Sequence, residues 1–371
     1  MKQNVFVKVF AVSSILFLGA VCVSYAKTTS SIVYTPAEKL TMVGKIMDTK
    51  NYYHRLDTLD YPDIPAVVKT RLICSAGLAV SFKTNSRAIY AKWTTDSVYP
   101  SAAQTPIAYR GLDLYIRNDA GKWQFAGVGR PRNGSNESSA TIVKNLDGKE
   151  VECLLYLPNY SETVSLSVGV DKGSYIKAGD NPFSKRILVY GSSIVQGAAA
   201  SRPGMAYTSR LSRAMGLNFL NLGTAAVGKM QPGVVEMIIG IDADAYVLDC
   251  IPNSFPKEIR ERAASLITGI REKHPEAPII VMQSVIRESG YFNREGGEKV
   301  RQQNIAIEEE VQKLLDKGMD KLYFIPADDF LGDDHEGTVD GTHPNDLGFD
   351  RMIRVIQPAL TDIFTKEGII R

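Results

Sequence analysis

Residues 187–197 read I-L-V-Y-G-S-S-I-V-Q-G, and this stretch decides the fold of the second half of the chain. The apolar, β-rich run up to Tyr190 predicts a buried strand, which the glycine after it ends. Apolar residues then recur near helical spacing over residues 205–215. A strand, a tight Gly/Ser turn and a helix place Ser193 at the carboxyl end of a strand, where open α/β sheets keep their ligand sites.

The same alternation of strand and helix continues to the end of the chain. Helical patterns, such as those over residues 259–270 and 300–315, separate short apolar runs. These runs, each a predicted strand, are Ile187–Tyr190, Phe219–Leu222, Tyr246–Leu248, Ile279–Met282 and Leu322–Ile325. Strands spaced by helices favour right-handed crossovers and a parallel sheet that is covered on both faces. We therefore expect a three-layer α/β domain with about five parallel strands over residues 184–371.

Residues 27–180 have a different pattern, in which apolar and polar residues alternate along short segments. The runs that begin at Leu78 and Val164, among others, show this period of two, which is typical of strands with one buried face. Turn sequences rich in Asn, Asp and Gly separate the runs. This half therefore predicts an antiparallel β-sandwich of a jelly-roll-like kind. Glycines and a proline in residues 172–183 predict the linker to the second domain.

The N-terminus predicts a segment that directs export. Lysines flank its start, an apolar run covers Val9–Val23, and residues 24–26 (S-Y-A) supply small side chains at a cleavage site. We expect a signal peptide over residues 1–26 and a mature protein that is periplasmic or extracellular. Lipoprotein anchoring is not favoured, because the residues before Cys22 fit a lipoprotein signal poorly. No other run is long enough to cross a bilayer.

Composition argues against several kinds of partner. The 371 residues carry a formal net charge of +2 and no basic cluster of the sort that follows a phosphate backbone, so no nucleic acid is expected. Signal cleavage leaves Cys74, Cys153 and Cys250. A disulfide between the first two is possible, but three small buried hydrophobes are the favoured interpretation. The cysteines lack metal-binding spacing, and we interpret the acidic run around His335 as a solvated loop.

A second motif lies near the far end of the chain, where residues 340–344 read D-G-T-H-P. A histidine that bonds a carboxylate through one ring nitrogen keeps the other nitrogen as a base for a serine hydroxyl. Asp340 and His343 are close enough in sequence for one short loop to hold both. With Ser193 they predict a nucleophile, a base, and a carboxylate that orients the base.

Together, these two motifs resemble the SGNH/GDSL hydrolase superfamily, in which the first block is Gly-Asp-Ser and the last is Asp-x-x-His. Here Ser192 stands in place of the Asp of the first block. The resemblance implies a flavodoxin-like α/β domain in which Ser193, Asp340 and His343 form a catalytic triad. In the first half, residues 111–115 (G-L-D-L-Y) resemble an element of a β-domain that often precedes SGNH domains in exported bacterial proteins.

The resemblance also implies an oxyanion hole, which stabilises the negative charge of the acyl-transfer intermediate. The family supplies its donors from the N–H of the nucleophile, from a Gly and from an Asn. These donors correspond here to Ser193, Gly223 and Asn253, and the last two follow the second and third predicted strands of the α/β half. Asn253 stands in I-P-N-S, whereas the family pattern is Gly-x-Asn-Asp.

For function, the resemblance implies a secreted serine esterase that works through an acyl-enzyme and needs neither a metal nor a cofactor. Relatives with an exported β-domain often remove acetyl groups from carbohydrates, so we expect short acyl esters, and acetylated glycans above all, as substrates. Two alternatives stay open: a lysophospholipase or thioesterase-like acyl hydrolase, and a glycan-binding protein without catalysis. The sugar, the acyl position, the oligomeric state and the role of the β-domain also stay open.

Overall fold

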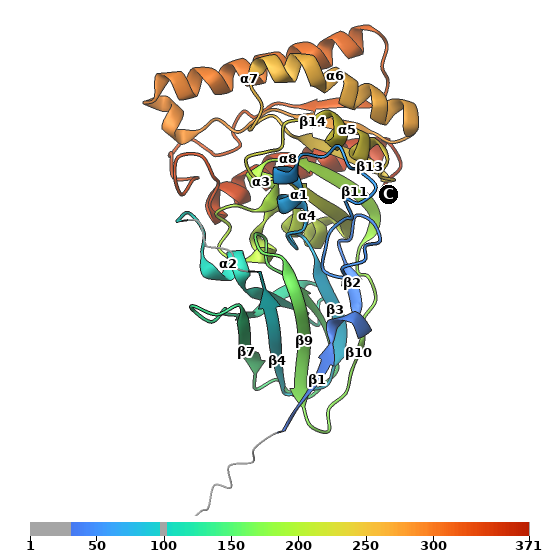
Figure 1. Ribbon diagram of the computed structural model, residues 1–371, viewed down its shortest axis with the longest axis vertical. Helices are drawn as coiled ribbons and strands as arrows, with labels where there is room; N and C mark the ends of the chain where they lie inside the picture. Colours follow the sequence, from blue (N-terminus) through green and yellow to red (C-terminus); the bar gives the residue numbers. More distant parts are fainter. Residues whose placement is uncertain (1–30, 97–101, 371) are drawn as a thin grey trace, which may run out of the picture. The chain divides into compact units, whose positions relative to one another are not determined.

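The structure, a computed structural model, describes residues 31–96 and 102–370 of the chain. The predicted signal peptide and Cys22 lie outside the described residues. From Ile32 onward the chain forms one compact unit, in which antiparallel sheets come first and a parallel sheet follows (Figure 1). This order confirms the predicted fold class, while the domain boundaries drawn from the sequence stay a prediction.

The first half of the chain forms a β-sandwich. Its strands are β1 (Ile32–Pro36), β2 (Thr41–Val43), β3 (Ala79–Thr84), β4 (Ala88–Thr95), β5 (Leu112–Arg117), β6 (Trp123–Gly129), β7 (Glu137–Lys144), β8 (Val151–Tyr156), β9 (Thr163–Asp171) and β10 (Ile176–Ala178). One antiparallel sheet has the order β1-β9-β4-β7, and the other has the order β10-β3-β8-β5-β6, with β2 paired to β3. Between the strands lie η1 (Ala37–Lys39), α1 (Ala66–Leu72) and α2 (Pro106–Arg110).

Apolar side chains from both sheets fill the interior of the sandwich, and Trp93 and Leu166 are among them. Val164 differs from the predicted alternation, because the residue is 53% exposed. The pairing of β4 with β9 passes from Ser165 directly to Thr163. Val164 therefore occupies a bulge, and a bulged residue drops out of the inward-facing series.

The second half of the chain forms a parallel sheet. Its strands are β11 (Ser184–Gly191), β12 (Leu217–Gly223), β13 (Ala245–Asp249), β14 (Ile279–Met282) and β15 (Leu322–Ile325), and each contains one predicted apolar run. They are arranged in the order β12-β11-β13-β14-β15, which is the flavodoxin-like order. After β11 the chain continues to one side through β12 and then to the other through β13. The carboxyl end of β11 is therefore the switch point, where ligands bind in such sheets.

Helices cover both faces of this sheet. They are α3 (Ser193–Gln196), η2 (Pro203–Met205), α4 (Tyr207–Met215), α5 (Pro232–Ile239), α6 (Pro256–Lys273), η3 (Glu288–Tyr291), α7 (Arg294–Asp316) and α8 (Asp346–Lys366). Side chains of α5, α6 and α7 pack with Leu188 on one face, and those of α3, α4 and α8 pack with Ile187 on the other (Figure 1). The predicted helical stripes over residues 259–270 and 300–315 are buried except at Leu315, which lies in the last turn of α7 and is exposed.

A long connection in the first half leaves the sandwich and covers the parallel sheet. Residues 44–78 join β2 to β3, and Figure 1 shows their helix α1 beside the elements of the second half. Ile46, Leu56 and Leu72 are buried in the same hydrophobic cluster as Leu188. A segment that the sequence assigned to the β-domain therefore completes the core of the α/β half.

The predicted linker is only partly a connection. Residues 176–178 form β10 and pair with β3, so the sandwich extends into this segment. Strand β11 then begins at Ser184, close to the predicted start of the α/β half. No helix of the described residues is both long and apolar enough to span a membrane.

The cysteines in the described part of the chain are unpaired. Cys74, Cys153 and Cys250 are all buried and free. Burial raises the pKa of each thiol, to about 11 for Cys74 and to about 12 for Cys250. The disulfide considered between Cys74 and Cys153 is not formed, and all three behave as small hydrophobic side chains.

Candidate active site

Ser193 lies at the switch point of the parallel sheet. Strand β11 ends at Gly191, where a side chain would meet the carbonyl oxygen of Asp249 at 2.3 Å, so only glycine fits. Ser192 is buried, and its hydroxyl accepts a hydrogen bond from the N–H of Ile194 at 3.2 Å. This bond caps α3, and Ser193 is the first residue of that helix. A helix therefore begins at Ser193 itself, before the one predicted over residues 205–215.

The loop from Thr338 to Pro344 brings His343 to this serine. Its two ends pair in an antiparallel bridge. Nε2 of His343 lies 2.9 Å from Oγ of Ser193, although 150 positions separate the two residues. Nδ1 of the same ring lies 2.7 Å from Oδ2 of Asp340. The structure thus brings the three residues of the predicted triad together in one hydrogen-bonded chain.

Asp340 is held by the backbone of its own loop. Its Oδ1 accepts hydrogen bonds from the N–H groups of Thr342, at 3.0 Å, and His343, at 2.8 Å. Partial burial raises the pKa of the Asp340 carboxyl, but the hydrogen bonds from His343 outweigh burial, so the pKa falls below its ordinary value of 3.8. An ionised carboxylate at Nδ1 keeps the ring proton there, which leaves Nε2 to accept the serine proton.

Gly223 does not line the pocket around Ser193. Its N–H donates to Oδ1 of Asn221 at 3.0 Å, and its carbonyl accepts from Nη1 of Arg55 at 3.0 Å. A side chain at this position would meet the backbone nitrogen of Gln196 at 2.2 Å. Close packing of β12 against α3 therefore requires this glycine, and its N–H is already used within the strand end. The structure does not bring it to the oxyanion position that the resemblance implied.

Ala226 and Asn253 line the same pocket as Ser193. Ala226, in the turn after β12, lines the pocket and has a left-handed φ of 66°. Within residues 31–96 and 102–370, no protein atom accepts a hydrogen bond from the N–H of Ala226 or of Ser193. Asn253 also lines the pocket, as predicted, and its Oδ1 faces the N–H of Gly228 at 3.4 Å. The amide nitrogen of Asn253 is therefore the end of this side chain that can donate to a ligand.

Both halves of the chain build the pocket, which has a volume of about 430 Å³. The first half contributes Arg71, Tyr109 and Tyr160, and the second half adds Arg287 to Ser193 and its neighbours. The two tyrosine rings stack at a centroid distance of 5.9 Å, and the Tyr160 hydroxyl donates to the Ser193 carbonyl at 3.2 Å. No spacing rule in the sequence relates these residues to the nucleophile, so they could not be predicted from it.

The G-L-D-L-Y element of the sandwich forms hydrogen bonds with the segment that follows the nucleophile. Asp113 is completely buried, and its Oδ2 accepts from Nη1 of Arg202 and from the N–H of Gly204, both at 2.9 Å. The hydroxyl of Tyr115 also contacts Arg202. Arg202 and Gly204 lie between α3 and α4. The motif therefore positions the chain just after Ser193, which gives the sandwich a structural part in the site.

His335 and the acidic residues around it do not form a metal site in the described part of the chain. Its Nδ1 lies 2.8 Å from Oε2 of Glu288, and the adjacent Asp334 pairs with Arg351. In the part of the chain that the structure describes, no group of three or more His, Cys, Asp or Glu side chains is arranged to hold a metal ion.

A hydrogen-bonded serine, histidine and aspartate at the switch point of a parallel sheet is the arrangement expected of an acyl hydrolase. Comparison with known proteins supports this class. Residues 184–361 match the GDSL-like lipase/acylhydrolase family, and residues 32–176 match the N-terminus of SGNH-hydrolase-type esterases. A solved structure from Bacteroides ovatus, named as a GDSL-like lipase, is 53% identical, with a TM-score of 0.88 over 90% of this chain and 98% of its own. The chain therefore belongs to the GDSL-like lipase/acylhydrolase family and is an ester-bond hydrolase, which confirms the resemblance.

More distant structures share the fold. A salicylyl acyltransferase from a tetracycline biosynthetic pathway is 18% identical, with a TM-score of 0.70 over 90% of this chain and 97% of its own. An acetyl xylan esterase from the rumen bacterium Butyrivibrio proteoclasticus is 12% identical, with a TM-score of 0.58 over 91% of this chain and 100% of its own. No curated protein matches the chain. At these identities the two likenesses concern the fold alone.

Proposed function

We propose that this protein is a serine esterase that hydrolyses short acyl esters, and acetyl esters of carbohydrates above all. The observation that carries the proposal is the chain of hydrogen bonds from Oγ of Ser193 to Nε2 of His343, at 2.9 Å, and from Nδ1 of His343 to Asp340, at 2.7 Å. Ser193 and His343 line the pocket of about 430 Å³, so a substrate that enters it reaches the nucleophile directly.

The reaction follows from this geometry. Oγ of Ser193 attacks the ester carbonyl carbon while Nε2 of His343 takes its proton. The tetrahedral intermediate then breaks its bond to the alcohol oxygen, which receives that proton from His343 and leaves. Water attacks the acyl-enzyme in the same way, and His343 returns the proton to Ser193 as the carboxylic acid departs. Asp340 stays ionised, orients the imidazole and stabilises its charged form.

The developing oxyanion needs preorganised donors near Ser193. We assign these to the N–H groups of Ser193 and Ala226 and to the amide nitrogen of Asn253, since all three residues line the pocket. Every residue except proline carries a main-chain N–H, so alanine can donate where the family uses glycine. This assignment replaces Gly223, whose N–H is bonded to Asn221.

The pocket also supports the choice of substrate. Ala198, Ala225 and other small side chains line it beside Ser193, which favours a short acyl group over a long one. Tyr109 and Tyr160 line it too, and aromatic rings suit the apolar face of a sugar. A structure described as a family two carbohydrate esterase and the acetyl xylan esterase share the fold, and this likeness supports the proposal without specifying a sugar.

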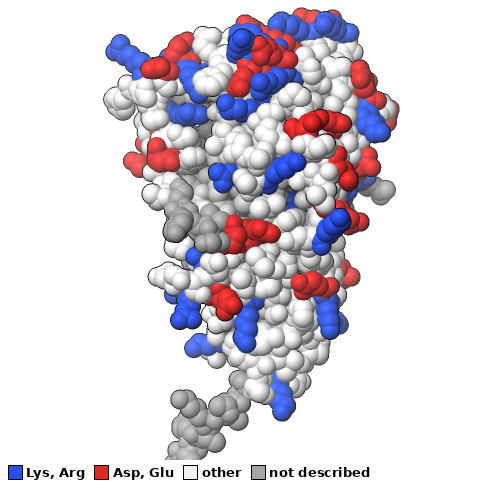
Figure 2. All heavy atoms as spheres, in the orientation of Figure 1, with Lys and Arg blue, Asp and Glu red and all other residues white. Residues whose placement is uncertain are grey.

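We further propose that the protein acts outside the cytoplasm, either in the periplasm or in the extracellular space. The support is the pattern of residues 1–26, with its lysines, apolar run and small residues before the cleavage site. A nucleic-acid partner is not expected. On the face that Figure 2 shows, Lys and Arg of the described residues are interspersed with Asp and Glu, and the formal net charge is only +2.

Two measurements test this function. A fluorophosphonate probe should label the mature protein, and peptide mass spectrometry should place the label on Ser193; a glycan-binding protein without catalysis would not be labelled. Acetate release from a panel of acetylated glycans should exceed hydrolysis of nitrophenyl esters with long acyl chains. A preference for long chains would instead support a lysophospholipase, and release from no ester at all would refute the proposal.

A further inference from the structure

The pocket beside Ser193 has an uneven charge balance. Arg71 and Arg287 both line it, and among the described residues that line it there is no Asp or Glu. Hydrolysis of a neutral ester by the triad requires neither arginine. Two positive side chains in a pocket whose described lining carries no carboxylate attract ligands of the opposite charge.

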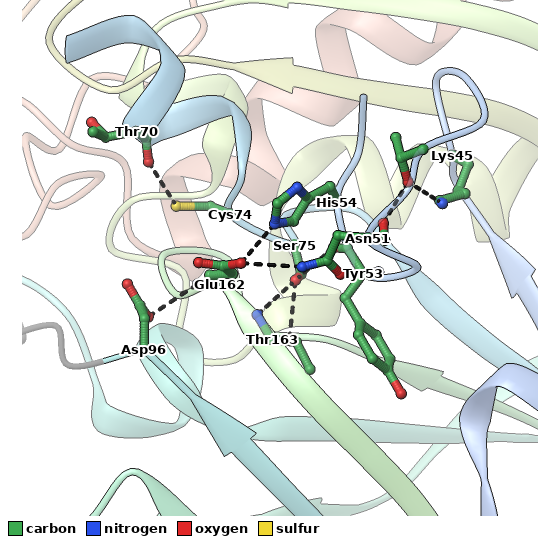
Figure 3. Close-up of polar contacts among 11 residues, drawn as sticks. Lys45, Asn51, Tyr53, His54, Thr70, Cys74, Ser75, Asp96, Glu162 and Thr163 are labelled. Atoms are coloured by element: carbon green, nitrogen blue, oxygen red, sulfur yellow. Dashed lines mark hydrogen bonds and ion pairs between the residues drawn. The ribbon is translucent and has the colours of Figure 1, made fainter. Parts of the chain in front are cut away.

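Arg71, in the last turn of α1, has no acidic partner. Its Nε is buried without a hydrogen-bond partner, and no ion pair joins it to a carboxylate of the described residues. Asp96 and Glu162 lie in the same region, since both act with Arg71 on the thiol of Cys74, but within the described residues neither forms an ion pair with Arg71. Figure 3 shows Glu162 directed at His54 and Asn51, at 2.7 and 3.2 Å, while Asp96 accepts a hydrogen bond from the N–H of Glu162 at 3.1 Å. Because no carboxylate of the described residues pairs with Arg71, its guanidinium keeps donors for an anionic ligand in the pocket.

Arg287 is in a similar position on the other half of the chain. Its Nη2 donates to the carbonyl of Pro252 at 2.9 Å, which leaves most of its N–H donors for another acceptor. Burial lowers the pKa of Arg287 and the charge of Asp340 raises it, but a guanidinium stays protonated near neutral pH. Asp340 acts on Arg287 only through longer-range attraction, since no direct ion pair joins the two in the described part of the chain.

A third arginine adds to the positive potential at this end of the sheet. Arg55 is completely buried, and its Nη1 donates to the carbonyl oxygens of Asn221, at 2.9 Å, and Gly223, at 3.0 Å. Its other terminal nitrogen contacts the carbonyl of Arg71. Burial lowers the pKa of Arg55 to about 10, so it is still charged at pH 7. Its hydrogen bonds go to carbonyl groups, and no carboxylate of the described residues forms an ion pair with it.

We propose that the natural substrate is an acidic sugar, whose carboxylate is bound by Arg71 and Arg287 while its acyl ester lies at Ser193. This inference rests on the proposed function and names its substrate class. Guanidinium groups bind a carboxylate through paired, charge-assisted hydrogen bonds, which an uncharged group cannot replace. In a uronic acid the carboxylate replaces the hydroxymethyl group at C6, so it lies on the same ring as the acylated hydroxyl groups. A pocket of about 430 Å³ accommodates such a monosaccharide unit.

The test compares two substrates that differ only at C6, the methyl glycosides of mono-O-acetylated galacturonate and galactose, with matched acetyl positions. We expect the wild-type protein to have at least about a tenfold higher kcat/KM on the galacturonate ester, because hydrogen bonds to charged groups are strong. The difference should lie mainly in KM and should shrink as salt screens the arginines.

The variants Arg71→Gln and Arg287→Gln should each reduce the ratio of the two kcat/KM values towards one. Arg130→Gln is the matched control, because Arg130 is exposed and lines a different cleft, on the sandwich. It should keep the wild-type ratio. Thermal unfolding of each variant, followed by circular dichroism, establishes that the folded protein is being compared.

Equal activity of the wild-type protein on both esters, or a ratio that survives both active-site substitutions, would overturn the acidic-sugar inference. A stronger preference for an acetylated galactose 6-sulfate would overturn the choice of a carboxylate. In these cases Ser193 would still react with the fluorophosphonate probe. Absence of both labelling and hydrolysis would instead overturn the proposed function itself, so the two failures can be told apart.

Discussion

Asp113 of the sandwich and Arg202 of the α/β half form an ion pair in which 2.9 Å separates Oδ2 from Nη1; the carboxylate is completely buried, and the arginine side chain is 20% exposed. The guanidinium of Arg202 also lies over the rings of Phe125, at 4.2 Å, and Tyr115, at 5.4 Å. Oδ1 of Asp113 is buried and has no hydrogen-bond partner within the described residues. Such a pair stabilises a fold only while both partners are present, because either one alone is a charge buried in a poorly solvated place.

The variant Asp113→Ala should therefore lower the free energy of unfolding by about 3 kcal/mol, the low end of the range for buried pairs, since it leaves a partly solvated Arg202 without its carboxylate. Urea denaturation followed by circular dichroism measures this change. Asp147→Ala serves as the control, because Asp147 pairs with Lys149 in an exposed position, where loss of the pair should not be detectable. Equal stabilities of the two variants would show that the sandwich does not depend on the buried pair.

Asn253→Ala tests the assigned oxyanion hole. Removal of one side-chain donor typically lowers kcat by about 10²–10³, and KM should change little because the donor acts on the transition state. Steady-state hydrolysis of 4-nitrophenyl acetate provides both constants. The control is Asn118→Ala, in an exposed turn of the sandwich. A kcat that stays at the wild-type value would remove Asn253 from the hole.

Ala226→Gly addresses the backbone donor. An alanine with a left-handed φ of 66° is strained, whereas glycine adopts this conformation freely and keeps the N–H. Relief of strain outweighs the greater flexibility of glycine in the unfolded chain, so we expect stability to rise by about 0.5–1 kcal/mol with kcat retained. Thermal unfolding and 4-nitrophenyl acetate hydrolysis measure the two effects. A fall in stability would mean that the turn does not hold Ala226 in this conformation.

Asp249 gives the folded state a dependence on pH. It is buried at the end of β13, and its Oδ2 accepts from the hydroxyl of Tyr207 at 3.0 Å. Burial raises the pKa of this carboxyl from 3.8 to about 7, and the bond from Tyr207 offsets only part of the rise. Between these two pH values the folded protein binds more protons than the unfolded chain, so this group makes stability fall as pH rises from about 4 to 7.

The variant Asp249→Asn cannot ionise and should lose this component of the pH dependence. Its melting temperature, compared with that of the wild-type protein, should therefore become relatively higher as pH rises from about 4 to 7 and then stay level. Melting curves at half-unit steps of pH provide the comparison. Parallel curves for the two proteins across this window would contradict the assignment of a raised pKa to Asp249.

Local patterns in the sequence were enough for much of the fold. Buried parallel strands are short apolar runs bounded by turns, so each strand from β11 to β15 could be predicted, as could the alternating strands of the sandwich. The pair Asp340 and His343 could be proposed because one loop holds both residues. Their approach to Ser193 is a long-range contact, which the resemblance suggested and the geometry now supplies.

Other features depend on packing between distant segments. The apolar character of Ile46 and Leu56 predicts that they are buried. It does not predict that they pack against the parallel sheet instead of the sandwich. Gly223 looked like a donor because it follows a strand, yet its N–H is used by Asn221. Ala226 carried no signal, since a left-handed φ is expected from glycine rather than alanine. Tertiary context decides each of these cases.

The most direct test of the central claim is the kcat of Ser193→Ala and His343→Ala on 4-nitrophenyl acetate, with folding checked by thermal unfolding. If the hydroxyl is the nucleophile and the imidazole is its base, each substitution should lower kcat by about 10⁶ without lowering stability appreciably. A folded variant of either kind that hydrolyses the ester at a rate near that of the wild-type protein would contradict the claim.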